Sequence, residues 1–528
     1  MAVTDFPALK EPGARTRSVR ERLVPAMPGD RLWGWLGPIL VMIFGGVLRF
    51  VNLAHPKTVV FDETYYAKDA FSLVTWLVER TFIKDADKAL LAGNTDIFEK
   101  CEAIDKCASY VVHPPLGKWM IGLGEWLFGM NTFGWRVSAA VVGTLSILII
   151  ARLARRMTRS TLLGCFAGLL LALDGLHFVL SRTALLDIFL MLFVLAGFAC
   201  LVVDRDKARE RLVDWYESSP LSDEGPYLGL RPWRLAAGLC LGAACAVKWS
   251  GIFFFVLFLM SWMWDAGARR AIGLRRPYAG AFRLDLPTGL LAGVVAPSLV
   301  YLASWTGWFA SPRGWGRNWE QATSSGPLFF VFDSFRSLVK YHFEVLGFHA
   351  QLTSSHPYQS EPWSWPLLLR PVAFYYEGKQ NACGVKDCSE AVLGVGTPVI
   401  WYGALAALVA LIAWYVSSRD WRAGAVLLGY AVAWLPWFYF AFKDNRTMFL
   451  FYAIPMVPFM VLAITLCAGL LIGPSWATQT RRTVGAAAVG SFALLALINF
   501  WWLYPILSAE VLPYVEWKSR MLFEKRWI

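Results

Sequence analysis

Long apolar runs, separated by short basic stretches, constrain this chain more than any other feature. A helix needs about 20 apolar residues to cross the hydrocarbon core of a bilayer, and about eleven runs reach or approach that length. The chain is 57% hydrophobic with a mean hydropathy of +0.47, which exceeds what a soluble domain of 528 residues needs. The sequence therefore predicts an all-α polytopic membrane protein. The runs cover residues 33–53, 134–154, 161–176, 183–203, 234–248, 251–265, 285–308, 397–416, 422–441, 447–471 and 483–504.

Lys and Arg in the short loops predict the orientation of the chain, because cytoplasmic loops of membrane proteins carry an excess of both. A basic cluster follows the second, fourth, sixth, eighth and tenth runs, on the same side as an Arg-rich N-terminal arm. We therefore expect a cytoplasmic N-terminus and, with an odd number of spans, a C-terminus outside. The clusters are Arg152, Arg155, Arg156 and Arg159; Arg205, Lys207, Arg209 and Arg211; Arg269, Arg270, Arg275 and Arg276; Arg419 and Arg422; and Arg481 and Arg482.

This topology divides the chain into a disordered cytoplasmic arm over residues 1–32 and one transmembrane domain over residues 33–528. The arm has no short apolar core followed by a small-residue cleavage site, so the first run is predicted to be an uncleaved span. The net charge of +12 would also suit nucleic acid, but the Lys and Arg lie in scattered loops rather than on one face. Membrane topology explains that pattern better, and we expect no nucleic-acid partner.

Two long polar stretches, residues 54–133 and 309–396, are expected to face outward. In the first, residues 65–79 and 116–130 have helical patterns and are predicted to lie along the membrane interface. The second is dense in Trp, Tyr, Pro and His, which is typical of interfacial anchoring and a shaped pocket rather than a flexible linker.

The adjacent carboxylates Asp62 and Glu63, in the first outer loop, are the strongest candidates for chemistry. Asp62 could simply cap a helix that starts near Thr64, which would contribute about 1 kcal/mol. Capping requires only one acid, however, and does not explain the aromatic and His residues nearby. A carboxylate at the membrane face can also act as a general base that takes a proton from an attacking alcohol. We therefore predict a catalytic pair.

Several further polar residues are candidates for substrate binding at the outer side. His113 and Lys118 flank a Pro-Pro turn that could be only a rigid bend. Outer-side cations suit a phosphate at headgroup level, because Arg offers forked hydrogen bonds and Lys a point charge. Such charges at span ends can also snorkel to the interface, and Arg182 with Asp187 could form a structural pair. The candidates are His113, Lys118, Arg136, Arg182, Asp187, Lys248, His356, Tyr358 and Arg446.

Four of the nine cysteines lie in the two polar loops. Cys101 with Cys107, and Cys383 with Cys388, are predicted to form local disulfides if the outer side is oxidising, with free thiols as the alternative. A metal clip is less consistent with the sequence, because neither pair has Cys-x-x-Cys spacing or a nearby set of histidines. The other five cysteines lie in apolar runs and are predicted to be small core residues.

A set of rare strings, in a fixed order between about residues 52 and 458, resembles the protein O-mannosyltransferase family. The match is specific because several such strings occur together. They are Phe61-Asp62-Glu63, His113-Pro114-Pro115-Leu116-Gly117-Lys118, Phe133-Gly134-Trp135-Arg136, Leu173-Asp174-Gly175, Ser181-Arg182 with Leu186-Asp187, Val247-Lys248-Trp249, His356-Pro357-Tyr358, Trp363-Ser364-Trp365-Pro366, and Arg446-Thr447-Met448-Phe449-Leu450-Phe451-Tyr452-Ala453-Ile454-Pro455.

The resemblance implies a GT-C glycosyltransferase fold, with a catalytic first outer loop and a polyprenyl-phosphate sugar as donor. It implies that Asp62 is the base, that Glu63 helps to position a substrate, and that Arg136 and the His-Pro-Pro segment shape the site. The chain departs from eukaryotic members in two ways. Val111 stands where they carry an acidic residue, and the interval 309–396 is too short for their MIR domain, so the chain looks like the bacterial type.

The resulting hypothesis is inverting transfer of mannose from polyprenyl-phosphate mannose to Ser or Thr hydroxyls of exported proteins, at the outer face of the cell membrane. Association with the protein export channel is a further partner hypothesis. Two alternatives remain: a GT-C transferase that modifies a lipid or cell-wall glycan, and a transporter. The transporter is disfavoured because the charges gather on one face and no repeat is visible. Asp62 and Glu63 could hold a divalent cation, but outer cations can neutralise a leaving phosphate unaided, and the metal-free mechanism is favoured.

Overall fold

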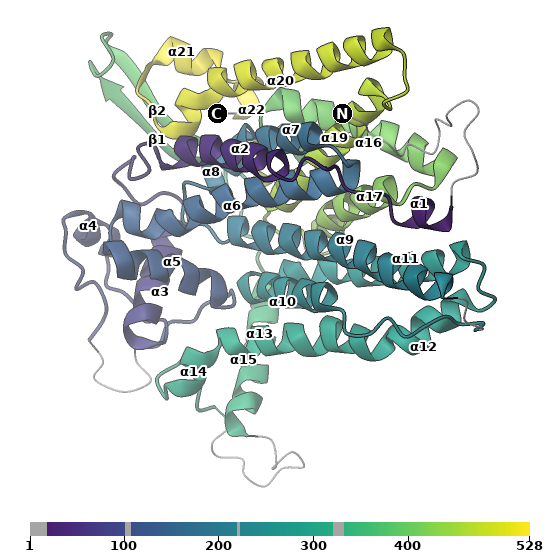
Figure 1. The fold of residues 1–528 in the computed structure, drawn as a ribbon. Coiled ribbons are helices and arrows are strands. Elements are labelled where there is room, and N and C mark those ends of the chain that lie inside the picture. Colours follow the sequence, from purple (N-terminus) through teal and green to yellow (C-terminus); the bar gives the residue numbers. More distant parts are fainter. Residues whose placement is uncertain (1–17, 101–106, 219–221, 320–331, 528) are drawn as a thin grey trace.

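The computed structural model describes residues 18–100, 107–218, 222–319 and 332–527, and shows a bundle of long helices with smaller elements at one end (Figure 1). Nine helical segments of this described part are long and apolar enough to cross a membrane, so the chain is a multi-pass membrane protein. They are α2 (Trp33–Phe50), α6 (Thr132–Thr158), α9 (Asp187–Glu217), η1 with α11 (Trp249–Phe255, Val256–Ala271), α12 with η2 and α13 (Pro277–Leu290, Leu291–Val295, Ala296–Ser304), α16 (Pro398–Ser418), α17 with α18 (Trp421–Trp434, Pro436–Asp444), η4 with α19 (Leu450–Met456, Val457–Ile472) and α20 (Gln479–Ser508).

Two shorter apolar helices occupy the remaining predicted runs, so the count of eleven spans stays a prediction. These helices are α7 (Thr161–Ala172) and α10 (Pro232–Val247), with 12 and 16 residues. A run was predicted over residues 161–176, but α7 stops early because Asp174 caps the next helix, α8 (Gly175–Leu180). The Asp174 carboxylate accepts a hydrogen bond of 2.9 Å from the His177 N–H.

The N-terminal arm is ordered where it meets the bundle, in contrast to the expected disorder. A short helix, α1 (Val19–Leu23), begins at Ser18 with a capping box completed by Glu21. Arg20 forms ion pairs of 2.6 Å with Asp214 and Glu217 near the C-terminal end of α9. These contacts give residues 18–23 a partner that their own sequence does not reveal, whereas residues 1–17 lie outside the described residues.

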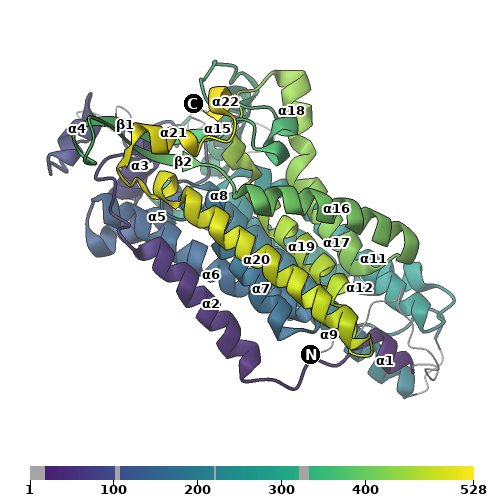
Figure 2. The same cartoon turned by 90° about the horizontal axis from the view of Figure 1, so that it is seen from above.

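The first polar stretch folds into three short helices at the end of the bundle opposite α1 (Figure 2). These helices are α3 (Glu63–Trp76), α4 (Ala86–Leu91) and α5 (Leu116–Phe128), which confirms the helices predicted over residues 65–79 and 116–130. On α5, Leu123, Trp126 and Leu127 are exposed, as expected of a helix that lies at a membrane interface.

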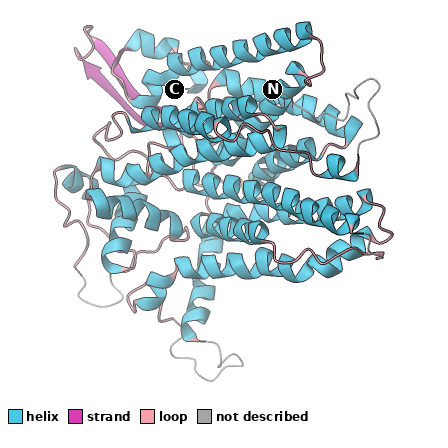
Figure 3. Ribbon diagram, viewed as in Figure 1, coloured by secondary structure: helices cyan, strands magenta, loops and turns pink. Residues whose placement is uncertain are grey.

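The second polar stretch and the C-terminus contain a small antiparallel sheet that the all-α prediction omitted (Figure 3). Strand β1 pairs with β2, and β2 pairs with β3 over two residues. The Val-, Phe- and Tyr-rich sequence of β1 suits a strand, but the surrounding aromatic density obscured that signal. The elements are α14 (Thr306–Ala310), α15 (Asp333–Ala350), η3 (Pro362–Leu367), β1 (Val372–Gln380), β2 (Asp387–Gly394), β3 (Leu512–Pro513), α21 (Tyr514–Ser519) and α22 (Glu524–Trp527).

Buried ion pairs fix the relative positions of α9, α10 and α11 near the α1 end. Arg231, immediately before α10, pairs with Asp204 on α9 and lies 2.9 Å from Asp265 on α11. Arg234 on α10 pairs with the same two carboxylates, and all four side chains are buried. Because α9 and α10 carry Asp187 and Lys248 at their other ends, this clamp also determines how those two residues meet.

Candidate active site

The turn that carries Asp62 is held in an unusual conformation by aromatic packing. Phe61 has a positive φ of 46°, a region that costs a residue with a bulky side chain about 1–3 kcal/mol. Its ring packs against Phe374 on β1 at 5.1 Å, His356 at 6.0 Å and Phe449 at 5.8 Å between ring centroids. Residues from three distant parts of the chain therefore determine where the next residue, Asp62, points.

The Asp62 carboxylate makes no hydrogen bond or ion pair with any described residue. Asp62 stands at the N-cap position of α3, but its side chain does not cap the helix, so the capping alternative is wrong. Burial raises the pKa of Asp62 to about 6, the Lys248 ammonium opposes that shift, and the Asp187 carboxylate adds to it. An unpaired carboxylate whose pKa lies near neutrality is suited to accept a proton.

Glu63, in contrast, is fully engaged and buried. Its two oxygens accept hydrogen bonds of 2.8 and 2.9 Å from Nε and Nη2 of Arg136, and bonds of 3.0 Å from the N–H groups of Val60 and Ala184. Arg136 also donates to the carbonyls of Pro56 and Thr58, at 2.9 and 2.8 Å. Glu63 and Arg136 therefore anchor the turn, and neither has a charge free for a substrate.

A cavity of about 230 Å³ opens among α9, η1, α15, α18 and η4. Two cations, Lys248 and Arg446, contribute to its polar part, together with Asp187, His113 and His349. The Lys248 ammonium lies 2.7 Å from the Asp187 carboxylate and 5.2 Å from the centre of the Tyr452 ring. The apolar part of the wall is formed by Leu190, Trp249, Ile252, Phe253, Phe254, Leu346, Ala433, Trp437, Phe440, Tyr452 and Pro455.

His349 links the His113 segment to Arg446 across this cavity. Its Nε2 lies 3.0 Å from the Val112 carbonyl, and its Nδ1 lies 3.3 Å from Nη2 of Arg446. A carbonyl accepts only and a guanidinium donates only, so Nε2 carries the proton and the ring is neutral. Burial, with the Arg446 charge, lowers the pKa of His349 to about 4, which agrees with that tautomer. His113 stacks on His349 with ring centroids 5.4 Å apart.

Three predicted binding residues lie in structural contacts instead of the cavity. Lys118 is buried against Glu79, and Arg136 is held by Glu63. Arg182 donates to the carbonyls of Arg49 and Val51, at 2.8 and 2.7 Å. The alternative in which Arg182 pairs structurally with Asp187 is wrong, because Asp187 pairs with Lys248 instead. Burial explains these outcomes, since a buried cation must satisfy its donors within the protein.

His356 and Tyr358 lie beside the Asp62 turn and outside the set of cavity-lining residues. The His356 ring packs on Phe61 and on Phe449, the latter at 5.1 Å, and its Nδ1 accepts a 3.1 Å bond from the Tyr358 N–H. His356 therefore contributes to the aromatic packing that holds the Asp62 turn.

The structure contains a disulfide between Cys383 and Cys388, with 6.0 Å between their Cα atoms. It closes the tip of the β1–β2 hairpin. Cys101, half of the other predicted pair, lies outside the described residues.

Sequence reasoning missed His349, Trp249 and Tyr452 as lining residues. His349 had a detectable signal, because it follows His342 by seven residues and two helical turns bring both rings to one face of α15. Trp249 follows Lys248 directly, and its Nε1 donates to the Tyr301 hydroxyl at 3.0 Å. That His349 and Trp249 line the cavity cannot be inferred without knowing how α13 and α15 pack.

The sequence left open a metal site formed by Asp62 and Glu63, which would need free oxygens on both carboxylates. Both oxygens of Glu63 already accept hydrogen bonds from Arg136 and backbone N–H groups, so Asp62 and Glu63 cannot chelate one ion together in this arrangement. In the described part of the chain, no group of three or more His, Cys, Asp or Glu residues is placed to hold a metal ion.

Comparison with known proteins identifies the family. The family model described as dolichyl-phosphate-mannose-protein mannosyltransferase matches residues 104–278, and the C-terminal four TMM region of protein-O-mannosyltransferase matches residues 334–527. A polyprenol-phosphate-mannose–protein mannosyltransferase of Mycolicibacterium smegmatis is 40% identical over 510 residues, covering 94% of this chain and 93% of the relative. The chain belongs to the protein O-mannosyltransferase family.

Two further proteins are similar to this chain over more than nine tenths of its length. The Corynebacterium glutamicum enzyme of the same name is 34% identical over 501 residues, 92% of each chain. The S. cerevisiae protein O-mannosyltransferase Pmt1-Pmt2 complex, solved with its sugar donor, has a TM-score of 0.69 at 15% identity, covering 97% of this chain and 94% of that one. At that identity the likeness shows the fold, which is the GT-C architecture predicted from the motifs.

Proposed function

We propose that this protein transfers mannose, with inversion, from polyprenyl-phosphate mannose to Ser or Thr hydroxyls of exported proteins. One observation carries the proposal: a cavity with two cations and an apolar wall lies within electrostatic reach of an unpaired carboxylate, Asp62. The family relationship supports the same reaction, since the relatives are named for this donor and for protein acceptors.

The cavity suits a lipid-linked donor chemically. Arg446 provides positive charge and forked hydrogen bonds for a phosphate, and the Lys248 ammonium, which pairs with Asp187, has two further N–H donors to offer. The apolar wall formed by Ile252, Phe253 and Phe440 suits isoprenyl units, which lose contact with water there. A phosphate stabilised in this way is a good leaving group and needs no acid catalyst.

Asp62 would activate the acceptor. Its carboxylate takes the hydroxyl proton while the hydroxyl oxygen attacks the anomeric carbon from the face opposite the phosphate. The new glycosidic bond forms as the carbon–oxygen bond to phosphate breaks, and polyprenyl phosphate leaves with the electron pair. One base on the acceptor side is sufficient, so the product has the inverted configuration.

We further propose that the site faces the outside of the cell membrane and the N-terminus faces the cytoplasm. The 31 residues of α9 span about 46 Å, with Asp187 at the site end and the contacts to α1 near the other end. Trp527 on α22 donates at 2.7 Å to the carbonyl of Leu368, which lies between η3 and β1. Because β1 packs against the Asp62 turn, the C-terminus lies at the site end of the molecule. The basic clusters favour a cytoplasmic α1 end. Association with the export channel stays a prediction.

The direct test is a reconstituted assay. Purified full-length protein in liposomes receives polyprenyl-phosphate [³H]mannose and a Ser/Thr peptide, and radiolabel in the peptide is expected. Label that enters only lipid or glycan would favour the other transferase hypothesis, and movement of the donor across the bilayer without transfer would favour a transporter.

The two cavity cations are expected to determine donor use. A charge-assisted hydrogen bond contributes about 1.5–3 kcal/mol, so Lys248→Ala and Arg446→Ala should each raise the donor KM by roughly 10- to 150-fold. The measurement is a donor titration at fixed acceptor peptide. Lys443→Ala is the matched control, because Lys443 is an exposed cation three residues from Arg446. Wild-type donor dependence in both cavity variants would place the phosphate elsewhere.

The pKa of Asp62 predicts a pH dependence. The base must be ionised, so kcat/KM for the acceptor should fall about tenfold per pH unit below about 6 and level off above it. Because the Lys248 ammonium lowers the pKa of Asp62, Lys248→Ala should move this limb to higher pH. A rate profile that is flat between pH 5 and 7, measured on protein that stays folded, would contradict the assignment.

A further inference from the structure

Strand β1 presents an unpaired row of main-chain groups beside the Asp62 turn. At the hairpin tip the Asn381 N–H donates to the Lys386 carbonyl, so these two residues form a hydrogen-bonded pair. Antiparallel pairs alternate between bonded and non-bonded, and the register pairs Gln380 with Asp387, Gly378 with Ser389 and Tyr376 with Ala391. The N–H and C=O groups of Tyr376, Gly378 and Gln380 therefore point away from β2.

The far side of β2 confirms this alternation. The Ala391 carbonyl accepts a 3.1 Å bond from the Ala509 N–H, so it points away from β1, as a non-bonded partner of Tyr376 must. Among the residues that the structure describes, no segment forms a backbone hydrogen bond to the outer edge of Tyr376, Gly378 or Gln380.

This edge is exposed and contains no Pro and no bulge between Tyr376 and Gln380; its charged residues are Glu377 and Lys379, and Lys379 pairs with Glu390 on β2. Tyr376 is 47% exposed, and Gly378 and Gln380 are also exposed. Proteins commonly block such edges with Pro, with a covering helix or with a bulge along the open stretch. Here the only irregularity of the β1–β2 register lies between Ala373 and Tyr375, before the open stretch begins.

The Tyr376 end of this open edge lies near the candidate base, Asp62. Phe374, at the bulge, packs its ring on Phe61 at 5.1 Å, and Phe61 precedes Asp62. Tyr376 lies two residues further along, about 7 Å in an extended strand. A chain that paired with Tyr376–Gln380 would therefore have its paired end two strand residues and one Phe374–Phe61 ring contact away from the Asp62 turn.

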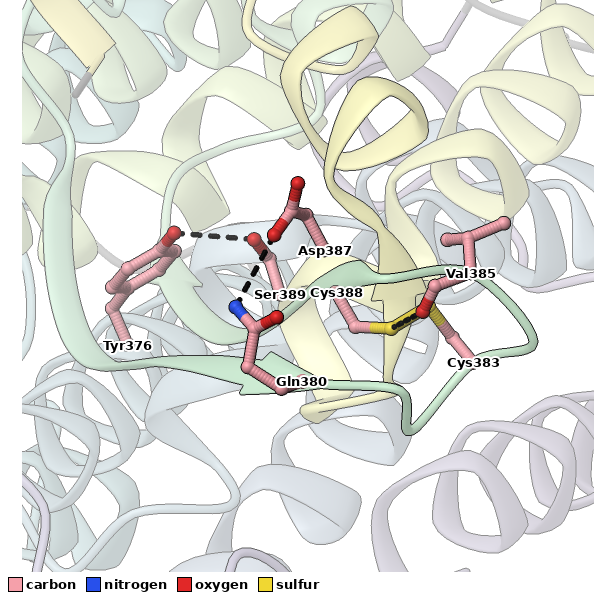
Figure 4. Close-up of a disulfide and its surroundings, with 7 residues drawn as sticks. All are labelled: Tyr376, Gln380, Cys383, Val385, Asp387, Cys388 and Ser389. Carbon is pink, nitrogen blue, oxygen red and sulfur yellow. Dashed lines mark hydrogen bonds between the residues drawn. A yellow bond between two sulfur atoms is a disulfide. The ribbon is translucent and has the colours of Figure 1, made fainter.

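A disulfide and two side-chain hydrogen bonds also stiffen the β1–β2 hairpin (Figure 4). The disulfide between Cys383 and Cys388 closes its tip, and the Gln380 amide donates to the Asp387 carboxylate at 3.2 Å. Tyr376 bonds to the Ser389 hydroxyl at 3.1 Å and packs on Trp517 of α21 at 5.0 Å. An edge held in place before binding requires less ordering when a partner strand is added.

We propose that the acceptor polypeptide binds as an added antiparallel or parallel strand along the outer edge of β1, which delivers a Ser or Thr to Asp62. This inference rests on the proposed function and identifies the surface that takes the acceptor. Strand addition uses main-chain hydrogen bonds, which every extended polypeptide offers, so it suits an enzyme that modifies unfolded segments of differing sequence.

A proline at Gly378 tests the enzyme side. The Gly378 N–H points away from β2, so Gly378→Pro removes no hairpin bond but deletes a donor and obstructs the added strand. Gly378→Ala is the matched control, since a Cβ there meets open space and the N–H remains. We expect the acceptor-peptide KM to rise about tenfold in the Pro variant, with the donor KM unchanged, and to stay within about twofold in the Ala variant.

An N-methyl scan of the acceptor peptide tests the partner side. Single N-methyl groups placed along the peptide should weaken transfer at every second residue, because alternate amides of an added strand face β1. Uniform tolerance, or equal KM values for the Pro and Ala variants, would overturn the proposal while leaving mannose transfer itself intact. A Gly378→Pro variant with altered oligomeric state and unchanged acceptor KM would show a subunit contact instead. Failure of wild-type protein to transfer mannose would refute the proposed function.

Discussion

Asp62→Asn is expected to lower mannose transfer by about 10²–10⁴-fold, the usual contribution of a general base. The amide keeps the shape of the side chain but cannot accept the proton of the attacking hydroxyl. Because the Asp62 carboxylate bonds to no described residue, its loss should leave folding and membrane insertion unchanged. The measurement is kcat at saturating donor and acceptor, with the thermal unfolding midpoint of the same preparation.

Asp85→Asn is the matched control for this variant. Asp85 lies in the same polar stretch, its side chain is 57% exposed, and its positive φ of 62° is one that Asn accepts readily. We expect the control to stay within about twofold of wild type. Activity of Asp62→Asn within about threefold of wild type would remove Asp62 from the role of base.

Arg136→Met is expected to destabilise the protein by about 3–5 kcal/mol, because it leaves the buried Glu63 carboxylate without its charged partner. This expectation differs from the prediction made from the sequence, in which Arg136 bound the donor phosphate. The structure shows both guanidinium edges occupied, by Glu63 and by the carbonyls of Pro56 and Thr58. The measurement is thermal unfolding in detergent, with the donor KM of the surviving folded fraction.

The double variant Glu63→Gln with Arg136→Met separates the two explanations. If the pair is structural, neutralising Glu63 should recover much of the lost stability, since no unpaired charge remains buried. A phosphate-binding Arg136 would instead give wild-type stability in Arg136→Met and a raised donor KM that Glu63→Gln cannot restore. That outcome would contradict the structural assignment.

The adjacent acids Asp62 and Glu63 illustrate why a motif does not divide roles among its members. Both carboxylates follow the same strained turn, yet one is unpaired and the other accepts four hydrogen bonds. The sequence places them together. Only the packing of α6, which carries Arg136, and of the distant segment that contains Ala184 distinguishes them. Lys248 and Lys118 each pair with a carboxylate, Asp187 and Glu79, yet only Lys248 lines the cavity, and the sequence does not distinguish them.

The small sheet was missed for a related reason. Its strands β1 and β2 lie in a stretch whose aromatic and Pro content resembles interfacial anchoring, and hydropathy does not distinguish the two. The pairing of β2 with β3 joins residues more than a hundred positions apart, near the C-terminus. Local sequence cannot reveal such a pairing, because its hydrogen bonds depend on where α20 ends.

The sequence by itself determined the class of the protein and the identity of its chemical groups. Apolar runs of spanning length require helices in a membrane, since only a helix satisfies its own backbone in lipid, and rare polar strings mark the family. Tertiary structure alone decided which of those groups are free to react. Packing pairs Glu63 with Arg136 and Asp187 with Lys248, whereas the Asp62 carboxylate has no such partner, so burial raises its pKa to about 6 within electrostatic reach of Lys248.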